Sequence, residues 1–365
     1  MSCRYLKIED FCSTGSGGTP SRSKPEYYEG GDIPWIKSGD LKDSKIYEAN
    51  EYITAAGLEN SSAKIVEKDS ILIAMYGATV GRLAILGINA ATNQAICNIR
   101  PDTTIADMKY LYYFLKSKFS YFVENAVGGA QPNISQGLIK SLEVPLPSLD
   151  EQKRIADILD KAAGVCQKRE QAIKLADDFL RAKFLEMFGT PANNIHRFPK
   201  GTIRDLVDSV NYGTSAKASI DSGEYPILRM GNITYQGRWD FTDLKYLDLS
   251  VKEKDKYLVK EGDLLFNRTN SKELVGKTAV YEEDRPMAFA GYLIRVRPNS
   301  IGNNYYISGY LNSIHGKITL MNMCKSIVGM ANINAQELQN IEILIPPKHL
   351  QDEYEIIYKK IKKGL

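Results

Sequence analysis

The chain carries one segment twice, and this duplication limits its possible folds more than any other feature does. The segment NISQGLIKSLEVPLPSLDEQ occupies residues 133–152, and NINAQELQNIEILIPPKHLQ occupies residues 332–351. Asn, Ile, Glu, Pro and Gln recur at matched positions, and several other positions exchange one apolar residue for another. A segment repeated over such a distance indicates a repeated architecture, in which each copy is one structural unit.

Further stretches of the first half match stretches of the second half in the same order. The pairs are DIPWIKSGDL (32–41) with EYPILRMGNI (224–233), IVEKDSILIAMYGATVGRLAIL (65–86) with LVKEGDLLFNRTNSKELVGKTAVY (258–281), INAATNQAICNIRPD (88–102) with PMAFAGYLIRVRPN (286–299), and KYLYYFLKS (109–117) with YYISGYLNS (305–313). The order is kept while the offset drifts, as expected when a gene duplicates and its loops then diverge. The chain is therefore predicted to contain two copies of one unit.

Each unit is predicted to be α+β. Short apolar runs between turn residues predict buried strands, and aromatic and aliphatic residues at helical spacing predict an amphipathic helix over 108–123 and its match near 305–318. We expect the Tyr and Phe residues of these helices to lie in the core. The predicted organisation is given by four ranges: a globular domain at 1–148, a spacer helix at 149–190, a second globular domain at 191–347, and a short C-terminal helix at 348–365.

A long helix is predicted at roughly 149–188, between Pro147 and the Gly189-Thr190-Pro191 stop. Apolar residues recur along it at heptad spacing, which is typical of a helix that packs against another helix. The predicted packing residues are Ile158, Leu159, Val165, Cys166, Ile173, Phe179, Leu180 and Met187. At about 1.5 Å per residue the helix would be roughly 57 Å long.

The second copy also enters a helix after its Pro346-Pro347 pair. We expect this helix, HLQDEYEIIYKKIKKGL, to pack antiparallel to the first one. It is much shorter in this sequence, so either the short form is native or another chain completes the pair.

Composition narrows the class of protein. The 365 residues suit two domains, the 43% hydrophobic content suits packed cores, and the net charge of +3 permits an acidic partner without requiring one. The five Cys are scattered without a CxxC pair and only three His occur, so we expect reduced thiols and no zinc site. The N-terminus lacks the apolar stretch of a signal peptide, and no apolar run is long enough for a membrane helix. We expect a soluble intracellular protein.

Motifs that would indicate catalysis are missing from the sequence. The tetrapeptide Val275-Gly276-Lys277-Thr278 resembles the end of a phosphate-binding loop, but Ser271 stands where that motif needs its first glycine. GxSxG and HExxH do not occur, and neither does the NPPY or DPPY tetrapeptide of amino-methyltransferases. Two large duplicated units without such groups favour recognition over catalysis, and we expect no catalytic, cofactor-binding or metal-binding residue.

Polar and basic loops rich in glycine occur at matching places of the two copies. Their side chains are of the kinds that bind phosphates and read base edges. For a single loop the simpler interpretation is an ordinary surface loop, and Asn133 and Asn332 also suit a turn. Because six such loops recur at matched positions, we interpret them as a DNA-binding surface. Its candidate residues are Thr19, Ser21, Arg22, Lys24, Lys37, Ser38, Tyr76, Arg82, Gln131, Asn133, Lys217, Arg229, Asn232, Arg268, Asn270, Lys272, Lys277 and Asn332.

Basic positions are matched between the copies, whereas some neighbouring positions differ. Lys37 corresponds to Arg229, and Arg82 corresponds to Lys277. Arg268 and Asn270 of the second copy correspond to Tyr76 and Gly77 of the first copy. Such differences are expected if the two units read different DNA sequences.

The chain resembles the specificity (S) subunit of type I restriction-modification systems. The resemblance rests on GGTPSRSKPEYY, IPWIKSGDL, ILIAMYGATVGRLAIL and above all NISQGLIKSLEVPLPSLDEQKRIADILD, and it extends over both copies. It implies that the two globular domains are target-recognition domains, each binding one half of a split, asymmetric DNA sequence. The helices would space the half-sites and dock two methyltransferase subunits.

The same resemblance implies several further expectations. The methyltransferase subunits would carry S-adenosylmethionine and methylate adenine, and a motor-nuclease subunit would join for restriction. This chain would bind double-stranded DNA without a cofactor of its own, in the cytoplasm of a prokaryote. The alternatives are a specificity subunit of another DNA-modifying phage-defence complex, an unrecognised sugar- or nucleotide-processing enzyme, and a scaffold that uses its helices alone.

Overall fold

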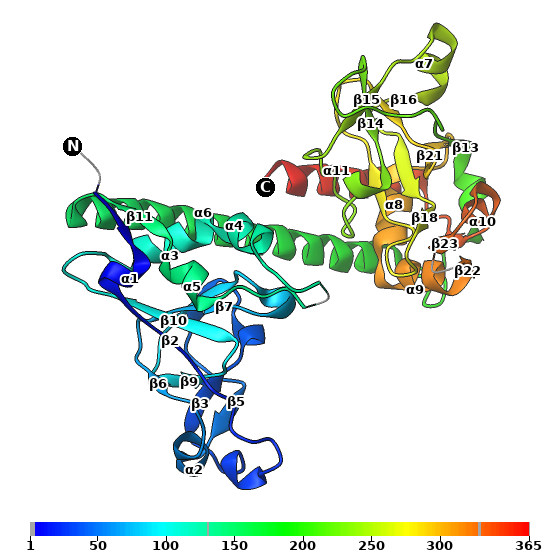
Figure 1. The fold of residues 1–365 in the computed structure, drawn as a ribbon. Helices are drawn as coiled ribbons and strands as arrows, with labels where there is room; N and C mark the ends of the chain where they lie inside the picture. Colours follow the sequence, from blue (N-terminus) through cyan, green and yellow to red (C-terminus); the bar gives the residue numbers. More distant parts are fainter. Residues whose placement is uncertain (1–3, 130, 328–329, 365) are drawn as a thin grey trace. The chain divides into compact units, whose positions relative to one another are not determined.

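The computed structural model describes residues 4–129, 131–327 and 330–364. The chain forms two compact units, Met1–Cys166 and Gln167–Leu365. The boundary between them falls inside one continuous helix, α6 (Leu149–Phe188), which follows the predicted long helix closely (Figure 1). Each unit therefore carries part of α6, and each is described separately below.

Unit 1 is built from three sheets and several short helices. Its sheets have the strand orders β2-β10-β7-β8-β4, β5-β3-β9-β6 and β1-β11. The strands are β1 (Arg4–Lys7), β2 (Cys12–Ser16), β3 (Ile33–Ile36), β4 (Ser44–Ile46), β5 (Glu51–Ile53), β6 (Ile65–Val66), β7 (Ile71–Ala74), β8 (Leu83–Leu86), β9 (Ala90–Thr92), β10 (Ile96–Pro101) and β11 (Glu143–Leu146). The helices before α6 are α1 (Ile8–Phe11), α2 (Ala55–Glu59), α3 (Met108–Ser117), α4 (Phe119–Glu124) and α5 (Gln136–Lys140).

Unit 2 repeats this plan. Its sheets have the strand orders β13-β21-β17-β19, β15-β14-β20-β16 and β12-β24, with a further small sheet β18-β23-β22. The strands are β12 (Lys200–Thr202), β13 (Val207–Tyr212), β14 (Tyr225–Leu228), β15 (Lys245–Leu247), β16 (Leu258–Val259), β17 (Leu264–Asn267), β18 (Thr269–Asn270), β19 (Thr278–Val280), β20 (Met287–Phe289), β21 (Leu293–Pro298), β22 (Lys325–Ile327), β23 (Met330–Asn332) and β24 (Glu342–Leu344). The helices after α6 are α7 (Val251–Tyr257), α8 (Asn304–Asn312), α9 (Ile314–Met323), α10 (Ala335–Gln339) and α11 (Lys348–Lys363).

The matching strand orders confirm the duplication and the α+β class. The central strands β7 and β17 are buried along their whole length, because each separates two cores. In β7, Ile71 and Ile73 belong to one apolar cluster and Leu72 to another. Alternate side chains of a strand point to opposite faces of its sheet, so a strand covered on both faces is apolar throughout.

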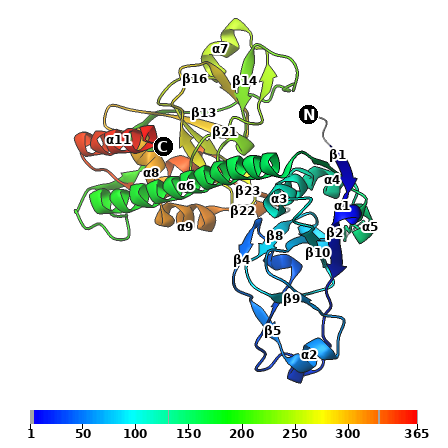
Figure 2. The ribbon, with the colours of Figure 1, turned by 90° about the vertical axis from the view of Figure 1, so that its left-hand side faces the viewer.

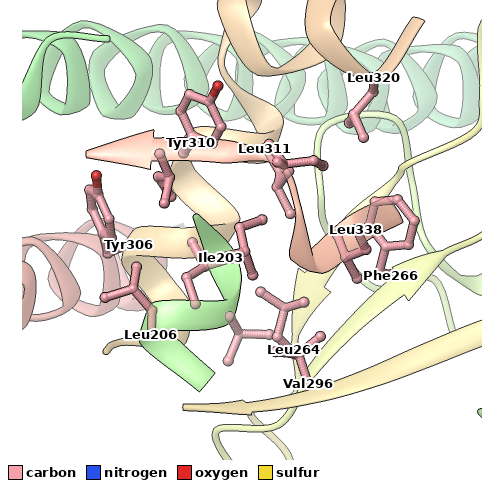
Figure 3. Close-up of a cluster of buried hydrophobic side chains, with 14 of the residues drawn as sticks. Ile203, Leu206, Leu264, Phe266, Val296, Tyr306, Tyr310, Leu311, Leu320 and Leu338 are labelled. Atoms are coloured by element: carbon pink, nitrogen blue, oxygen red, sulfur yellow. The ribbon is translucent and has the colours of Figure 1, made fainter. Parts of the chain in front are cut away.

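The aromatic helices differ from the prediction in one respect. Each was expected as a single helix, but each is broken into two, at Lys118 between α3 and α4 and at Ser313 between α8 and α9. Ser313 has an extended backbone, and its side chain accepts a hydrogen bond from the amide of Gly316, which starts a new helix there. The aromatic side chains of α8 lie in the core, as expected (Figure 3).

The duplicated segment forms the same joint in both units. In unit 1 it runs from α5 through β11 into α6, and in unit 2 from α10 through β24 into α11. Its matched glutamines, Gln152 and Gln351, are completely buried. The Gln152 amide donates to the carbonyls of Pro147 (2.9 Å) and Ile105 (3.1 Å). The Gln351 amide donates to the carbonyls of Pro346 and Ile301, both at 2.9 Å. The recurring glutamine thus fastens the start of each spacer helix to its globular unit.

We expect Gln152→Leu to lower the free energy of unfolding of unit 1 by about 1–3 kcal/mol. Leucine nearly matches glutamine in volume, but it leaves the Ile105 and Pro147 carbonyls and the Asp107 amide without their partner. Urea unfolding followed by circular dichroism measures the change. Gln167→Leu, at an exposed position of the same helix, is the control and should change stability by less than about 0.5 kcal/mol. Equal stability of both variants would show that the buried glutamine contributes nothing.

The C-terminal part of α6 packs against α11 inside unit 2. Phe184 and Phe188 are buried, and both rings contact Tyr354 of α11, with centroids 5.3 and 5.9 Å apart. The two helices run in opposite directions where they lie side by side (Figures 1 and 2). The expected antiparallel pairing is confirmed, but aromatic residues outside the predicted seam form it.

The predicted seam of α6 is mostly uncovered in the described chain. Leu180 is buried and Met187 packs against the unit 2 core. The other predicted packing residues are exposed, namely Ile158, Leu159, Val165, Cys166, Ile173 and Phe179. These six therefore do not mediate the pairing of α6 with α11, and their predicted role in binding partner subunits stays a prediction.

Candidate nucleic-acid interface

Predicted DNA-binding residues of unit 2 line one hollow of about 830 Å³. We call it the basic hollow, because Arg229, Lys245, Arg268 and Lys277 line it together with Asn270 and Tyr292. The loops that follow β13, β14, β17 and β20 all reach it. The two four-stranded sheets of unit 2 therefore bring together cations that are far apart in the sequence.

Arg268 directly follows the buried strand β17 and is held by an aromatic ring. Its guanidinium carbon lies 4.8 Å from the centre of the Tyr212 ring, a geometry that stabilises a cation and restricts its motion. Its Nε is buried and has no hydrogen-bond partner among the described protein atoms. Because Arg268 also lines the hollow, its guanidinium can bind an anion or a base edge there.

Asn270 and Asn332 are brought to the same place by strand pairing. β18 pairs antiparallel with β23, so that Thr269 lies opposite Asn332 and Asn270 opposite Ala331. The Thr269 hydroxyl donates to the side-chain oxygen of Asn332 at 3.2 Å. The pairing joins two predicted DNA-binding segments into one surface.

Lys277 lines the same hollow and is largely buried. It follows Gly276, whose φ of +78° suits a tight turn. Burial lowers the pKa of Lys277, and neither Lys277 nor Arg268 forms an ion pair within the described residues. Because an isolated buried charge is unfavourable, an anion entering the hollow would be stabilised here.

The strand register corrects one predicted correspondence between the units. The carbonyl of Met75 accepts from the amide of Ile134, and the carbonyl of Arg268 accepts from the amide of Ile333, both at 2.9 Å. Arg268 therefore matches the buried Met75, and Tyr76 matches Thr269. Asn270 still corresponds to Gly77. The predicted counterpart of Arg268 is therefore wrong by one residue, whereas that of Asn270 is unchanged.

Unit 1 places its candidate cations differently. Arg22 and Lys37 both form ion pairs with Glu51, and the Arg22 guanidinium lies 4.4 Å from the Tyr28 ring centre. The hydrogen bond from Lys37 lowers the pKa of Glu51. Two candidate cations thus share one carboxylate. The basic character of this surface therefore depends on whether the ion pairs with Glu51 open when a ligand binds.

The remaining unit 1 candidates lie at several separate places. Tyr76 pairs with Asn133 in an isolated β-bridge, and Gln131 lies exposed beside them. Thr19 is hydrogen-bonded to Gln94, and Lys24 donates to the Tyr27 hydroxyl at 3.0 Å. The Ser21 hydroxyl is hydrogen-bonded to Ser23, and Ser38 begins a short 3-10 turn after Lys37. Arg82 is exposed in a separate hollow of about 420 Å³.

Some unit 2 candidates do not line the basic hollow. Asn232 is buried and bonds to the Arg229 amide (2.8 Å) and to the carbonyls of Asp240 and Asp243, so that it holds its own loop. Lys217 is exposed outside the hollow, and Lys272 lines a different one. Lys245 and Tyr292, by contrast, line the basic hollow and were not predicted. Lys245 reaches the hollow through the pairing of β15 with β14, and Tyr292 lies in the turn between β20 and β21.

Within residues 4–129, 131–327 and 330–364, no cluster of three or more His, Cys, Asp or Glu side chains has a metal-binding arrangement. Across the same ranges, no helix combines the length and the apolar character needed to cross a membrane.

Two α+β units of matching strand order, the second with a hollow lined by Arg229, Lys245, Arg268 and Lys277, define a protein built from a duplicated domain. The chain belongs to the family described as "Type I restriction modification DNA specificity domain", which it matches over residues 4–175 and 198–363. This confirms the resemblance found in the sequence.

Curated relatives are specificity subunits of type I restriction enzymes. The EcoR124I/EcoR124II subunit of Escherichia coli is 33% identical over 150 residues, which is 40% of this chain and 37% of that protein. The MjaIX subunit of Methanocaldococcus jannaschii is 33% identical over 50% of this chain and 42% of that protein. The EcoKI subunit of E. coli K12 is 24% identical over 89% of this chain and 74% of its own length. The matches to the first two relatives thus span less than half of those proteins.

A solved structure shares the fold. It is the crystal structure of the S subunit of a type I restriction-modification system from M. genitalium, with a TM-score of 0.63 and 15% identity. The likeness covers 100% of this chain and 90% of that one.

Proposed function

We propose that this chain is the DNA sequence-recognition subunit of a type I restriction-modification complex. Each unit reads one half of a bipartite, asymmetric target in double-stranded DNA. The observation that carries the proposal is the convergence of Arg268, Asn270 and Lys277 on the basic hollow, with no ion pair for either cation among the described residues. The domain organisation proposed from the sequence is retained: globular domains at 1–148 and 191–347, each followed by a spacer helix.

The differences between the units support an asymmetric target. In unit 2, Arg268 and Lys277 have no ion pair among the described residues and Arg229 pairs with Asp243, whereas in unit 1 Arg22 and Lys37 share the carboxylate of Glu51. Arg and Asn side chains pair with guanine and adenine edges, while Lys contacts to phosphate position the protein without reading sequence. Two units with different side chains at matched positions would read different base sequences.

The other parts of the proposal concern partners. The exposed apolar residues of α6 would dock two methyltransferase subunits, which carry S-adenosylmethionine and methylate adenine, and a motor-nuclease subunit would complete the complex. This chain would contribute no catalytic residue and bind no cofactor. The complex would act on DNA in the cytoplasm of a prokaryote.

Modification mapping tests the proposed function directly. The chain is co-expressed with its cognate methyltransferase, and methylated adenines in the host genome are located by long-read sequencing. We expect one split motif with a non-specific gap. A map without a split motif, obtained with a stable complex, would contradict the proposal.

We expect Lys277→Met to weaken DNA binding equally for target and non-target DNA. Loss of one phosphate contact should reduce the slope of log K against log salt by about 0.9. Fluorescence anisotropy at several salt concentrations measures both quantities. Lys252→Met removes an exposed lysine of α7 and should leave the slope unchanged. A loss confined to target DNA would assign Lys277 to base reading instead.

Cys166 gives a chemical test of docking on α6. Among the described cysteines it is the exposed one, whereas burial raises the pKa of Cys12 and Cys97 to about 12 and slows their reaction. In a Cys3→Ser background we expect Cys166 to be alkylated rapidly in the free chain and slowly in the complex with the methyltransferase. Equal rates, measured by mass spectrometry, would place the docking surface elsewhere.

A further inference from the structure

Helix α9 exposes an apolar stripe that no described residue of unit 2 covers. Ile314, Ile318 and Met321 are 68%, 49% and 41% exposed, and their spacing places them on one face of the helix. Leu274 and Tyr235 extend the stripe, with 39% and 44% of their surface exposed. Together these five residues line a hollow of about 440 Å³, which we call the α9 groove. A contiguous exposed apolar surface of this kind is typical of a protein interaction site.

Positive charge surrounds the α9 groove. Arg181, Lys272 and Lys317 line it, against a single carboxylate, Glu273. Lys317 lies 4.8 Å from the Tyr235 ring centre and has no ion pair within the described residues. Burial, with the nearby charges of Arg181 and Lys277, lowers the pKa of Lys317 to about 8. A carboxylate brought to this lysine would relieve both the desolvation and the repulsion.

Unit 1 shows the same combination at the matching place. Helix α4 exposes Phe119 and Val123, which are 48% and 49% exposed and one turn apart. The hollow beside Phe119 is lined by Lys42, Arg82 and Lys116, against the single carboxylate of Asp43.

The turn glycines fix this correspondence between the units. Gly81 and Gly276 have φ values of +80° and +78°, and a Cβ on either would meet the following helix, at Phe119 (3.2 Å) or Leu320 (2.6 Å). Surfaces of duplicated units normally diverge. The recurrence of apolar and basic groups at this place therefore argues for a shared use.

We propose that the α9 groove docks an acidic amphipathic helix of a protein partner. The apolar stripe would receive residues spaced three and four apart, as in other complexes of a helix in a groove, while carboxylates of that helix would meet Arg181 and Lys317. DNA fits less well, because a phosphate backbone offers no apolar face to Ile314, Ile318 and Met321. The inference rests on the proposed function, which supplies the partner for the test, the cognate methyltransferase subunit.

The test replaces an exposed apolar residue of the groove by a carboxylate in the full chain. We expect Ile318→Asp, and independently the more exposed Ile314→Asp, to weaken binding of the purified methyltransferase at least about tenfold. Val251→Asp, at an 82% exposed residue of α7, is the matched control and should bind normally. Circular dichroism and thermal unfolding verify that all three variants fold. DNA binding by the free chain should be the same for all of them.

A second variant separates the two kinds of occupant. Lys317→Met should weaken methyltransferase binding several-fold at low salt, without changing the affinity for DNA or its salt dependence. A smaller salt slope for DNA would mean that the groove holds the DNA backbone, and would overturn the inference. Unchanged methyltransferase binding by both Asp variants would also overturn it, while leaving the proposed function intact. Failure of the unmodified chain to bind the methyltransferase would contradict both.

Discussion

Replacing Phe184 with alanine is expected to lower the free energy of unfolding of unit 2 by about 3–5 kcal/mol. The Phe184 side chain is 1% exposed, and its ring lies 5.0, 5.5 and 5.3 Å from the rings of Phe188, Tyr306 and Tyr354. It therefore joins α6, α8 and α11 at one point. Alanine would remove these contacts and leave a cavity where the spacer helix enters the globular part of the unit.

Trp239 reports on this change, because it lies in unit 2 and the chain has only one other tryptophan, Trp35. With Trp35 replaced by Phe, denaturant unfolding followed by fluorescence should show the unit 2 transition shifted by Phe184→Ala. Leu185→Ala, at a neighbouring residue that is 38% exposed, should shift it far less. Similar shifts for the two variants would mean that the end of α6 does not anchor unit 2.

The regular parts of this fold could be predicted from the sequence. The duplication follows from the repeated segments. The buried strands β7 and β17 follow from apolar runs between turns, and the extent of α6 follows from a helical period between proline stops. The buried Gln152 and Gln351 explain why the duplicated segment kept its glutamine.

The contacts of the spacer helix could not be predicted in the same way. The heptad pattern selected Ile158, Val165 and Ile173, which are exposed, whereas Phe184 and Phe188 pack against α11. A heptad spacing of apolar residues shows which residues share a face of a helix, but it does not show which face packs against a neighbouring element. That choice depends on side chains of α8 and α11, more than a hundred residues further along the chain.

The sequence predicted the residue types of the candidate site, but it did not predict which of their charges form ion pairs. The sequence assigned Lys37, Arg22 and Lys277 the same predicted role, contact with DNA. In the structure the first two share an ion pair with Glu51, and Lys277 is buried without an ion pair in the described chain. These differences arise from pairing between distant strands, as does the separation of Lys272 from the basic hollow.

Replacing Arg268 and Asn270 together by alanine is expected to relax one half of the DNA target and leave the other half unchanged. The Tyr212 ring holds Arg268 in place, and β18 fixes Asn270 beside Asn332 through its pairing with β23, so both side chains are positioned before DNA arrives. Each lost base contact should cost about 1–3 kcal/mol of discrimination. Because Arg favours guanine and Asn favours adenine, we expect the relaxed positions to be G and A.

Methylation maps of cells carrying the variant complex measure this effect base by base. Arg285→Ala removes an exposed cation of unit 2 outside the basic hollow, and should leave the motif intact. Equal loss of selectivity in both halves would indicate a folding defect, and an unchanged motif would exclude Arg268 and Asn270 from reading. A change confined to one half would assign the basic hollow to that half-site, because the two residues belong to unit 2 alone.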